Sequence, residues 1–249
     1  MQTTRHHPKE RLKSLLILGF KLMHNGHNSK YISNKLILKV HYLNRMLCVT
    51  NLSCTRGERR LFSGVDFQLK AGTCLHLQGD NGAGKTSLLR QVSGLSPVAA
   101  GQVSWFGHPI ADNDAFRAQR IYLGHELAMK DDLSATENLH FDAYIAGQTV
   151  TAETVRSALK RLGLRGREHL PMRVLSQGQK HRAALARLLV RQANLWILDE
   201  PVVALDLPAQ AAVGQLLEAH LEEGGMALVT SHQPLPIPHA LIASYRLQG

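Results

Sequence analysis

From Met46 onward, short apolar runs alternate with longer stretches in which apolar residues recur every three or four positions. The short runs predict strands over residues 47–53, 73–78, 195–198 and 227–230, with the last buried strand at 227–230. The longer stretches predict helices over residues 85–92, 134–146, 151–162, 176–191 and 208–223. Residues 103–109 predict a β-hairpin arm. Strands separated by helices indicate an α/β fold whose parallel sheet is covered on both faces.

Residues 1–45 do not share this pattern, because their apolar residues keep no clear period. This leader holds nine of the 29 Lys and Arg residues and one of the 19 Asp and Glu residues, so it carries +8 of the formal net charge of +10. The rest of the chain is nearly neutral. The overall basicity therefore does not indicate a nucleic-acid-binding domain.

The leader is open to three interpretations. We favour Met46 as the biological start, with residues 1–45 unstructured or added by the choice of an upstream start codon. The second interpretation is a basic arm that contacts anionic lipid or nucleic acid, and the third is a targeting peptide. We accordingly divide the chain into a leader at 1–45 and a single domain at 46–249.

The cysteines and the hydropathy indicate the compartment. The three cysteines form no CxxC pair, which is typical of reduced thiols in the cytosol. The longest apolar stretch near the start, residues 15–20, is too short to cross a bilayer. Any membrane role is therefore expected to come through a partner.

A glycine-rich loop follows the predicted strand at 73–78 and precedes the predicted helix at 85–92. It matches the phosphate-binding pattern GxxxxGK[ST] in full and comprises Gly79, Asp80, Asn81, Gly82, Ala83, Gly84, Lys85 and Thr86. Its backbone N–H groups and the positive end of the following helix can face phosphate oxygens. Lys85 supplies a charge for the β- and γ-phosphates, and the Thr86 hydroxyl can bind Mg²⁺. A chance glycine turn is disfavoured by this strand–loop–helix context.

Two carboxylates follow the apolar run at 195–198. A buried strand that ends at Asp199 places this carboxylate beside the metal of a phosphate site. Glu200, one residue on, can polarise the attacking water as a general base. An ordinary strand that ends in surface acids is the alternative, and the P-loop upstream argues against it.

The segment Leu-Ser-Gln-Gly-Gln at 175–179 predicts a second helix start that can bind a phosphate. Ser176 is placed as the N-cap, with Gln179 at the capping-box position, and Gly178 keeps the backbone N–H accessible. These five residues alone fit an ordinary capped helix. The basic helix that leads from them straight into the carboxylate strand favours the phosphate site.

Taken together, these motifs resemble the ATP-binding subunits of ABC transporters over about residues 46–249; the further matches are Ala204-Leu205-Asp206 and Ser231-His232. The resemblance implies a P-loop NTPase (RecA-like) α/β core, an N-terminal antiparallel β subdomain and an inserted helical subdomain at about 124–185, with ATP and Mg²⁺ bound. It also implies a head-to-tail dimer, in which Ser176 and Gly178 of one copy close on the nucleotide held by the loop from Gly79 to Ser87 of the other. In this family Asp206 would signal across the dimer, and His232 would contact the γ-phosphate.

A narrower resemblance points to the haem-exporter ATP-binding proteins of cytochrome c maturation. It is carried by the opening run at 46–54, by Tyr-Leu-Gly-His at 122–125 and by residues 137–141 and 175–188. It implies integral membrane partner subunits, a location on the cytoplasmic face of the inner membrane and no nucleic-acid partner. Transport of another cargo stays open. A ribosome-associated or nucleic-acid-associated member is disfavoured, because the domain occurs once and lacks a long insertion.

Three positions depart from the pattern of these families. Glu126 stands where a glutamine usually links Mg²⁺ and the γ-phosphate to the membrane subunit, so we expect it to face the nucleotide and bind the metal. Arg56 stands where an aromatic ring usually stacks on adenine, and a guanidinium can stack instead. Gln177 replaces the common glycine.

Overall fold

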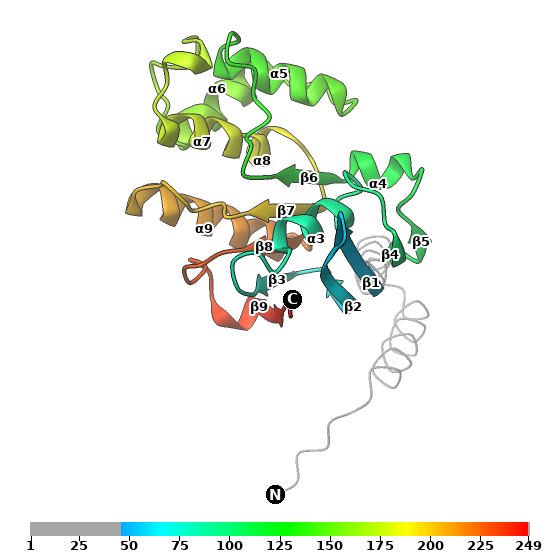
Figure 1. Ribbon diagram of the computed structural model, residues 1–249. Helices are drawn as coiled ribbons and strands as arrows, with labels where there is room; N and C mark the ends of the chain where they lie inside the picture. Colours follow the sequence, from blue (N-terminus) through cyan, green and yellow to red (C-terminus); the bar gives the residue numbers. More distant parts are fainter. Residues whose placement is uncertain (1–45, 249) are drawn as a thin grey trace, which may run out of the picture. The chain divides into compact units, whose positions relative to one another are not determined.

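The computed structural model describes residues 46–248, so the expectations for the leader at 1–45 lie outside the described residues. Within this range the chain forms a four-stranded antiparallel sheet, ordered β2-β1-β4-β5, and a five-stranded parallel sheet, ordered β6-β7-β8-β3-β9 (Figure 1). This combination confirms the predicted α/β fold class with an antiparallel β subdomain.

The antiparallel sheet contains both the strand predicted at 47–53 and the predicted hairpin arm. Its strands are β1 (Met46–Arg56), β2 (Arg59–Lys70), β4 (Ala100–Trp105) and β5 (His108–Pro109). β1 pairs with both β2 and β4. β2 was not predicted, although its buried residues alternate with exposed ones in the way that a half-buried strand requires.

The parallel sheet has two more strands than the sequence predicted. Its strands are β3 (Thr73–Gln78), β6 (Arg120–Leu123), β7 (Leu195–Asp199), β8 (Met226–Thr230) and β9 (Ile242–Arg246). β8 is the last buried strand, as predicted, but the unpredicted strand β9 follows it and pairs with β3. β9 lies at the edge of the sheet and is only partly buried, so it lacks the continuous apolar run that marks β7 and β8.

The two faces of the parallel sheet belong to two different cores. Along β7, Leu195 and Ile197 pack with residues of β1, β2 and α3 (Lys85–Val92), whereas Trp196 and Leu198 pack with the helices on the other side. The sheet is therefore covered on both faces, as predicted. One of the two covers is the antiparallel sheet together with a helix, rather than helices alone.

The remaining helices follow the predicted ranges closely, apart from two differences. They are α4 (Asp114–Ala118), α5 (Ala135–Ile145), α6 (Ala152–Arg161), α7 (Gln177–Leu185), α8 (Arg187–Val190) and α9 (Leu207–Glu222), with short 3-10 turns at Met172–Val174 and His239–Leu241. α4 was not predicted. The single helix expected at 176–191 is divided at Ala186, whose N–H donates to the carbonyl oxygens of both Arg182 and Ala183 and so tightens the turn.

Figure 1 shows α5 to α8 gathered on the side of the parallel sheet away from the antiparallel sheet, and α5 packs against both α6 and α8. Among the described residues, no helix combines the length and the apolarity needed to cross a bilayer.

His220 of α9 is a buried titratable group on the helical side of the sheet. Its ring stacks on Trp196 with 3.8 Å between the ring centroids, and its Nε2–H donates to the Met226 carbonyl oxygen at 3.2 Å. A side chain at Gly225 would meet this imidazole at 2.3 Å, so the packing requires glycine there. Burial lowers the pKa of His220 to about 4, and the ring is therefore neutral in the folded protein near pH 7.

We predict that His220 makes the fold sensitive to acid. The unfolded chain takes up a proton near pH 6.5 and the folded chain does so only near pH 4, so stability is complete above pH 6.5 and falls as the pH drops toward 4. By pH 5 this residue should lower the free energy of unfolding by about 2 kcal/mol. Urea unfolding of wild type and His220→Phe at pH 7.5 and pH 5 measures the effect. Equal losses in the two proteins would contradict it.

Candidate functional site

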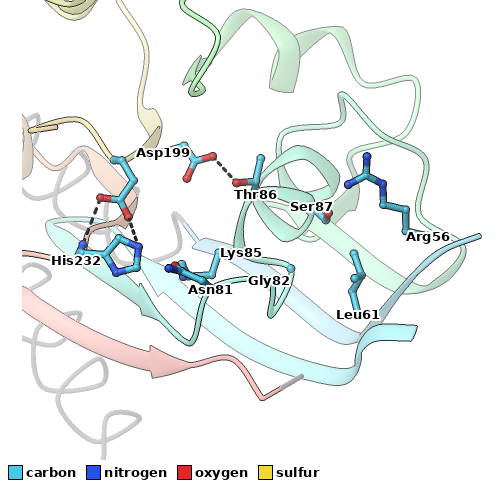
Figure 2. A pocket seen from close by; sticks show the side chains of 11 residues that line it. Arg56, Leu61, Asn81, Gly82, Lys85, Thr86, Ser87, Asp199 and His232 are labelled. Atoms are coloured by element: carbon cyan, nitrogen blue, oxygen red, sulfur yellow. Dashed lines mark hydrogen bonds and ion pairs between the residues drawn. The ribbon is translucent and has the colours of Figure 1, made fainter. Parts of the chain in front are cut away.

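A pocket of about 300 Å³ lies between the P-loop and the carboxyl end of β7 (Figure 2). The residues that line it are Arg56, Leu61, Asn81, Gly82, Gly84, Lys85, Thr86, Ser87, Asp199, Glu200 and His232. All of them except Leu61 were predicted from the sequence to be site residues. The structure thus gathers residues from four separate segments of the chain around one cavity.

The P-loop joins β3 to α3 and has the backbone conformation that its glycines allow. Gly82 and Gly84 have φ values of 83° and 97°, which other residues rarely adopt. A side chain at Gly84 would also meet the Phe62 ring of β2 at 2.9 Å. Gly84 is the N-cap of α3 and provides no side-chain cap, so the first N–H groups of this helix remain available to an anion.

Lys85 folds back over the P-loop. Its Nζ donates to the carbonyl oxygens of Gly79 and Asp80, at 2.8 and 3.1 Å. These contacts hold the ammonium group within the pocket, beside the loop that is predicted to hold the phosphates. Gly79 and Asp80 themselves line a neighbouring pocket, which shares Lys85 and His232 with the first one.

Thr86 of α3 and Asp199 of β7, which were both predicted to bind a metal, are in direct contact. Thr86 Oγ1 donates to Asp199 Oδ2 at 2.7 Å, as the dashed line between them in Figure 2 marks. Asp199 is 7% exposed, and its other oxygen accepts a hydrogen bond from Thr230 Oγ1 at 2.7 Å. Thr230 was not predicted. Its signal in the sequence is a hydroxyl residue at the end of an apolar run.

This oxygen pair fits Mg²⁺. A hydroxyl and a carboxylate are hard ligands, and Mg²⁺ in nucleotide sites takes few protein ligands and completes its shell with phosphate oxygens and water. The described residues hold no cluster of three or more His, Cys, Asp or Glu side chains that could bind a metal without a nucleotide.

Glu200 and His232 lie side by side at the other wall of the pocket. The His232 backbone N–H donates to Glu200 Oε2 at 3.2 Å, and His232 Nε2 lies 3.6 Å from Glu200 Oε1. Within residues 46–248, this buried Oε1 has no hydrogen-bond donor. Glu200 lines the pocket, and a carboxylate at the wall of a phosphate pocket can accept a proton from water, as the predicted general base must.

Arg56 and Leu61 form the end of the pocket that the antiparallel sheet contributes (Figure 2). Arg56 is the last residue of β1, and Leu61 lies near the start of β2. Leu61 was not predicted, because its place depends on the pairing of β1 with β2. An apolar side chain and a guanidinium together offer an adenine ring a surface on which to stack.

The predicted cross-dimer residues lie outside this pocket. Ser176 caps α7 in a capping box with Gln179, and Asp206 caps α9 and pairs with Arg182 at 2.8 Å. A side chain at Gly178 would lie 3.2 Å from the Ala204 carbonyl oxygen. Their predicted contact with a nucleotide needs a second copy of the chain, so it stays a prediction.

Glu126 follows β6, is exposed and does not line the pocket. The negative charge of Glu126 acts on Tyr122. The pKa of Tyr122 is raised to about 12, chiefly by burial and then by the negative charges of Asp199 and Glu126. The carboxylate thus lies near the site without entering it. Its predicted role as a metal ligand stays a prediction.

Comparison with known proteins places this site in context. The model of the ABC transporter family matches residues 62–203. The cytochrome c biogenesis ATP-binding export protein CcmA of Dechloromonas aromatica (strain RCB) is 49% identical over 203 residues, which are 81% of this chain and 100% of that protein. The protein of the same name from Pseudomonas aeruginosa is 47% identical over 77% of this chain and 95% of its own.

Two solved structures that are described as ABC transporter proteins also resemble this chain. A putative ABC transporter ATP-binding protein from Pyrococcus furiosus superposes with a TM-score of 0.70 at 25% identity, covering 81% of this chain and 97% of that one. A structure described as the ATP-binding subunit of an ABC transporter has a TM-score of 0.69 at 26% identity. The match covers 75% of this chain and 79% of that one.

We predict that Lys85→Ala weakens ATP binding by about tenfold to a hundredfold, because a charge-assisted hydrogen bond contributes about 1.5–3 kcal/mol. Fluorescent ATP titration of the purified protein measures this. Lys160→Ala, at an exposed lysine on α6, is the matched control and should bind as wild type. Unchanged affinity in Lys85→Ala would refute the P-loop assignment.

We also predict that Glu126→Gln raises ATPase activity or lowers the Mg²⁺ requirement. One unit charge acting through water at short range changes the energy by about 1 kcal/mol, so the expected change is about fivefold. Glu153→Gln removes an exposed carboxylate on α6 and serves as the control. If both substitutions are silent, Glu126 has no part in the site.

Proposed function

This chain belongs to the ABC transporter family of ATP-binding proteins, and we propose that it hydrolyses ATP to drive a haem exporter in c-type cytochrome biogenesis. The observation that carries the ATPase proposal is the convergence of Lys85, the Thr86–Asp199 pair and Glu200 on one pocket. The cargo proposal rests on relatives that are 44–49% identical and are named as cytochrome c biogenesis export proteins.

The phosphates of ATP would bind along the P-loop. The free N–H groups at the start of α3 would face the phosphate oxygens, and Lys85 would exchange its carbonyl partners for the β- and γ-phosphates. Arg56 and Leu61 would contact the adenine end. Thr86 and Asp199 would hold Mg²⁺, which neutralises charge on the phosphates.

Hydrolysis would use Glu200 as the general base. A water in the pocket beside Glu200 would give up a proton to the carboxylate while its oxygen forms a bond to the γ-phosphorus. The bond from that phosphorus to the β–γ bridging oxygen breaks, and ADP leaves with the electron pair. His232 would contact the γ-phosphate from the side at which it already holds Glu200.

The second wall of the γ-phosphate site would come from another copy of the chain. The N-terminus of α7, with Ser176 and Gly178, lies outside its own pocket and would offer backbone N–H groups to an anion. A head-to-tail dimer would bring it onto the nucleotide of the partner. Closure and opening of this dimer would move the attached transporter.

The transport path would belong to integral membrane subunits of a cytochrome c maturation complex, with this chain on the cytoplasmic face of the inner membrane. The absence of a membrane-crossing helix among residues 46–248 is compatible with this arrangement.

Deleting the gene should abolish c-type cytochromes, detected by haem staining of membrane proteins. Wild type should restore them, and Glu200→Gln should not. Normal c-type cytochromes in the deletion strain would contradict the cargo proposal.

We predict that Glu200→Gln lowers ATP hydrolysis by roughly two to four orders of magnitude, the usual contribution of a general base. ATP binding should survive, because Lys85, Thr86 and Asp199 are unchanged. The trapped ATP should also convert monomer to dimer, which light scattering can follow. Adding Ser176→Arg to Glu200→Gln should abolish the dimer by blocking the cap. A dimer that persists unchanged with Ser176→Arg would refute the head-to-tail geometry.

A further inference from the structure

We infer that Thr230 is a positioning residue for ATP hydrolysis, because its side chain links the Asp199 carboxylate to the backbone of Glu200. The inference rests on the proposed ATPase function. It assigns to one buried hydroxyl group the task of holding the metal ligand and the general base in a fixed relation.

The pairing of β7 with β8 places Thr230 where this task requires it. The two strands are parallel, and Asp199 is paired with Thr230 at their common end. Thr230 is fully buried, and β8 is apolar over the four residues that precede it. A buried hydroxyl needs hydrogen-bond partners, and those of Thr230 are Asp199 and the Glu200 N–H, both of which belong to the site.

The direction of each hydrogen bond follows from the chemistry of the partners. The Glu200 backbone N–H lies 3.0 Å from Thr230 Oγ1 and can only donate, so the threonine oxygen accepts from it. The single hydroxyl hydrogen is then free for Asp199 Oδ1, at 2.7 Å. No rotation of the hydroxyl satisfies both neighbours in another way, so the group is locked.

Glu200 needs this support because its backbone is unusual. Its φ is +55°, in the left-handed region that residues other than glycine seldom adopt. Both the carbonyl oxygen and the hydroxyl of Thr230 accept from the Glu200 N–H, at 3.2 and 3.0 Å. Thr230 therefore helps to hold the turn that aims the Glu200 carboxylate at His232.

The contacts form one continuous chain across the site. Thr86 donates to Asp199, Thr230 donates to Asp199, the Glu200 N–H donates to Thr230, and the His232 N–H donates to the Glu200 carboxylate. Apart from the peptide bond between Asp199 and Glu200, the Thr230 hydroxyl is the side-chain link in this chain between the residue proposed for the metal and the residue proposed for the water. Removing the hydroxyl leaves the bond from the Glu200 N–H to the Thr230 carbonyl oxygen, so it should loosen the relation between the two carboxylates while the P-loop remains intact.

The test compares Thr230→Val with Thr230→Ser in the full chain. Valine has nearly the shape of threonine but no hydroxyl, and serine keeps the hydroxyl. Two readouts are measured: the Kd for ATP in EDTA and in saturating Mg²⁺, and the turnover with Mg²⁺ and ATP. The control is Ser93→Ala, which removes another fully buried hydroxyl, one that donates only to the Arg90 carbonyl oxygen.

Thr230→Val should keep the wild-type Kd in EDTA, lose about tenfold of the Mg²⁺-dependent gain in affinity and lose at least tenfold in turnover. Thr230→Ser and Ser93→Ala should stay within about threefold of wild type in all three quantities. If Thr230→Val unfolds, Thr230→Ala against Thr230→Ser repeats the test, because these two differ only by the hydroxyl.

A purely structural role would lower the urea midpoint of Thr230→Val and leave its Mg²⁺-dependent gain and turnover at wild-type values, and that result would overturn the inference. Wild-type protein that binds no ATP in either condition would instead overturn the proposed function, and the inference with it. The two failures are thus told apart by the wild-type titration alone.

Discussion

The site depends on the parallel pairing of β3, β7 and β8, because parallel strands deliver their carboxyl ends to one edge of the sheet. β8 pairs with both of the others, and each strand is followed directly by part of the site. β3 leads into the P-loop, β7 ends in Asp199 and β8 ends in Thr230. A one-residue slip would exchange the two buried faces of β7, so core packing fixes the register that the chemistry uses.

The same edge also connects the pocket to the helix proposed to serve the other copy. The Nε2–H of His181 in α7 donates to the Pro201 carbonyl oxygen at 3.0 Å, and Arg182 pairs with Asp206. The segment that leaves Glu200 is therefore tied to the α7 helix at two points. A change at Glu200 on hydrolysis has a short path of direct contacts to the surface that would hold the partner subunit.

Much of the site could be predicted because its motifs are local in sequence. The P-loop, Asp199 and Glu200 each follow an apolar strand, and their residue types limit the chemistry they can perform. Thr230 and Leu61 could not be assigned in this way, since their roles depend on which residues the strand pairing sets opposite them. β9 was not predicted, because an edge strand needs no continuous apolar run. The division of the helix at Ala186 was not predicted either, because no proline or glycine marks it in the sequence.

A structure of the full chain with Mg²⁺ and a non-hydrolysable ATP analogue tests the central claim most directly, namely that the shared ends of these strands build the nucleotide site. The account predicts phosphates against the N–H groups at the start of α3, with the metal bound by Thr86 and Asp199 and the Thr230 hydroxyl still donating to Asp199. A nucleotide bound elsewhere, or a metal held by residues away from the ends of β3 and β7, would contradict it.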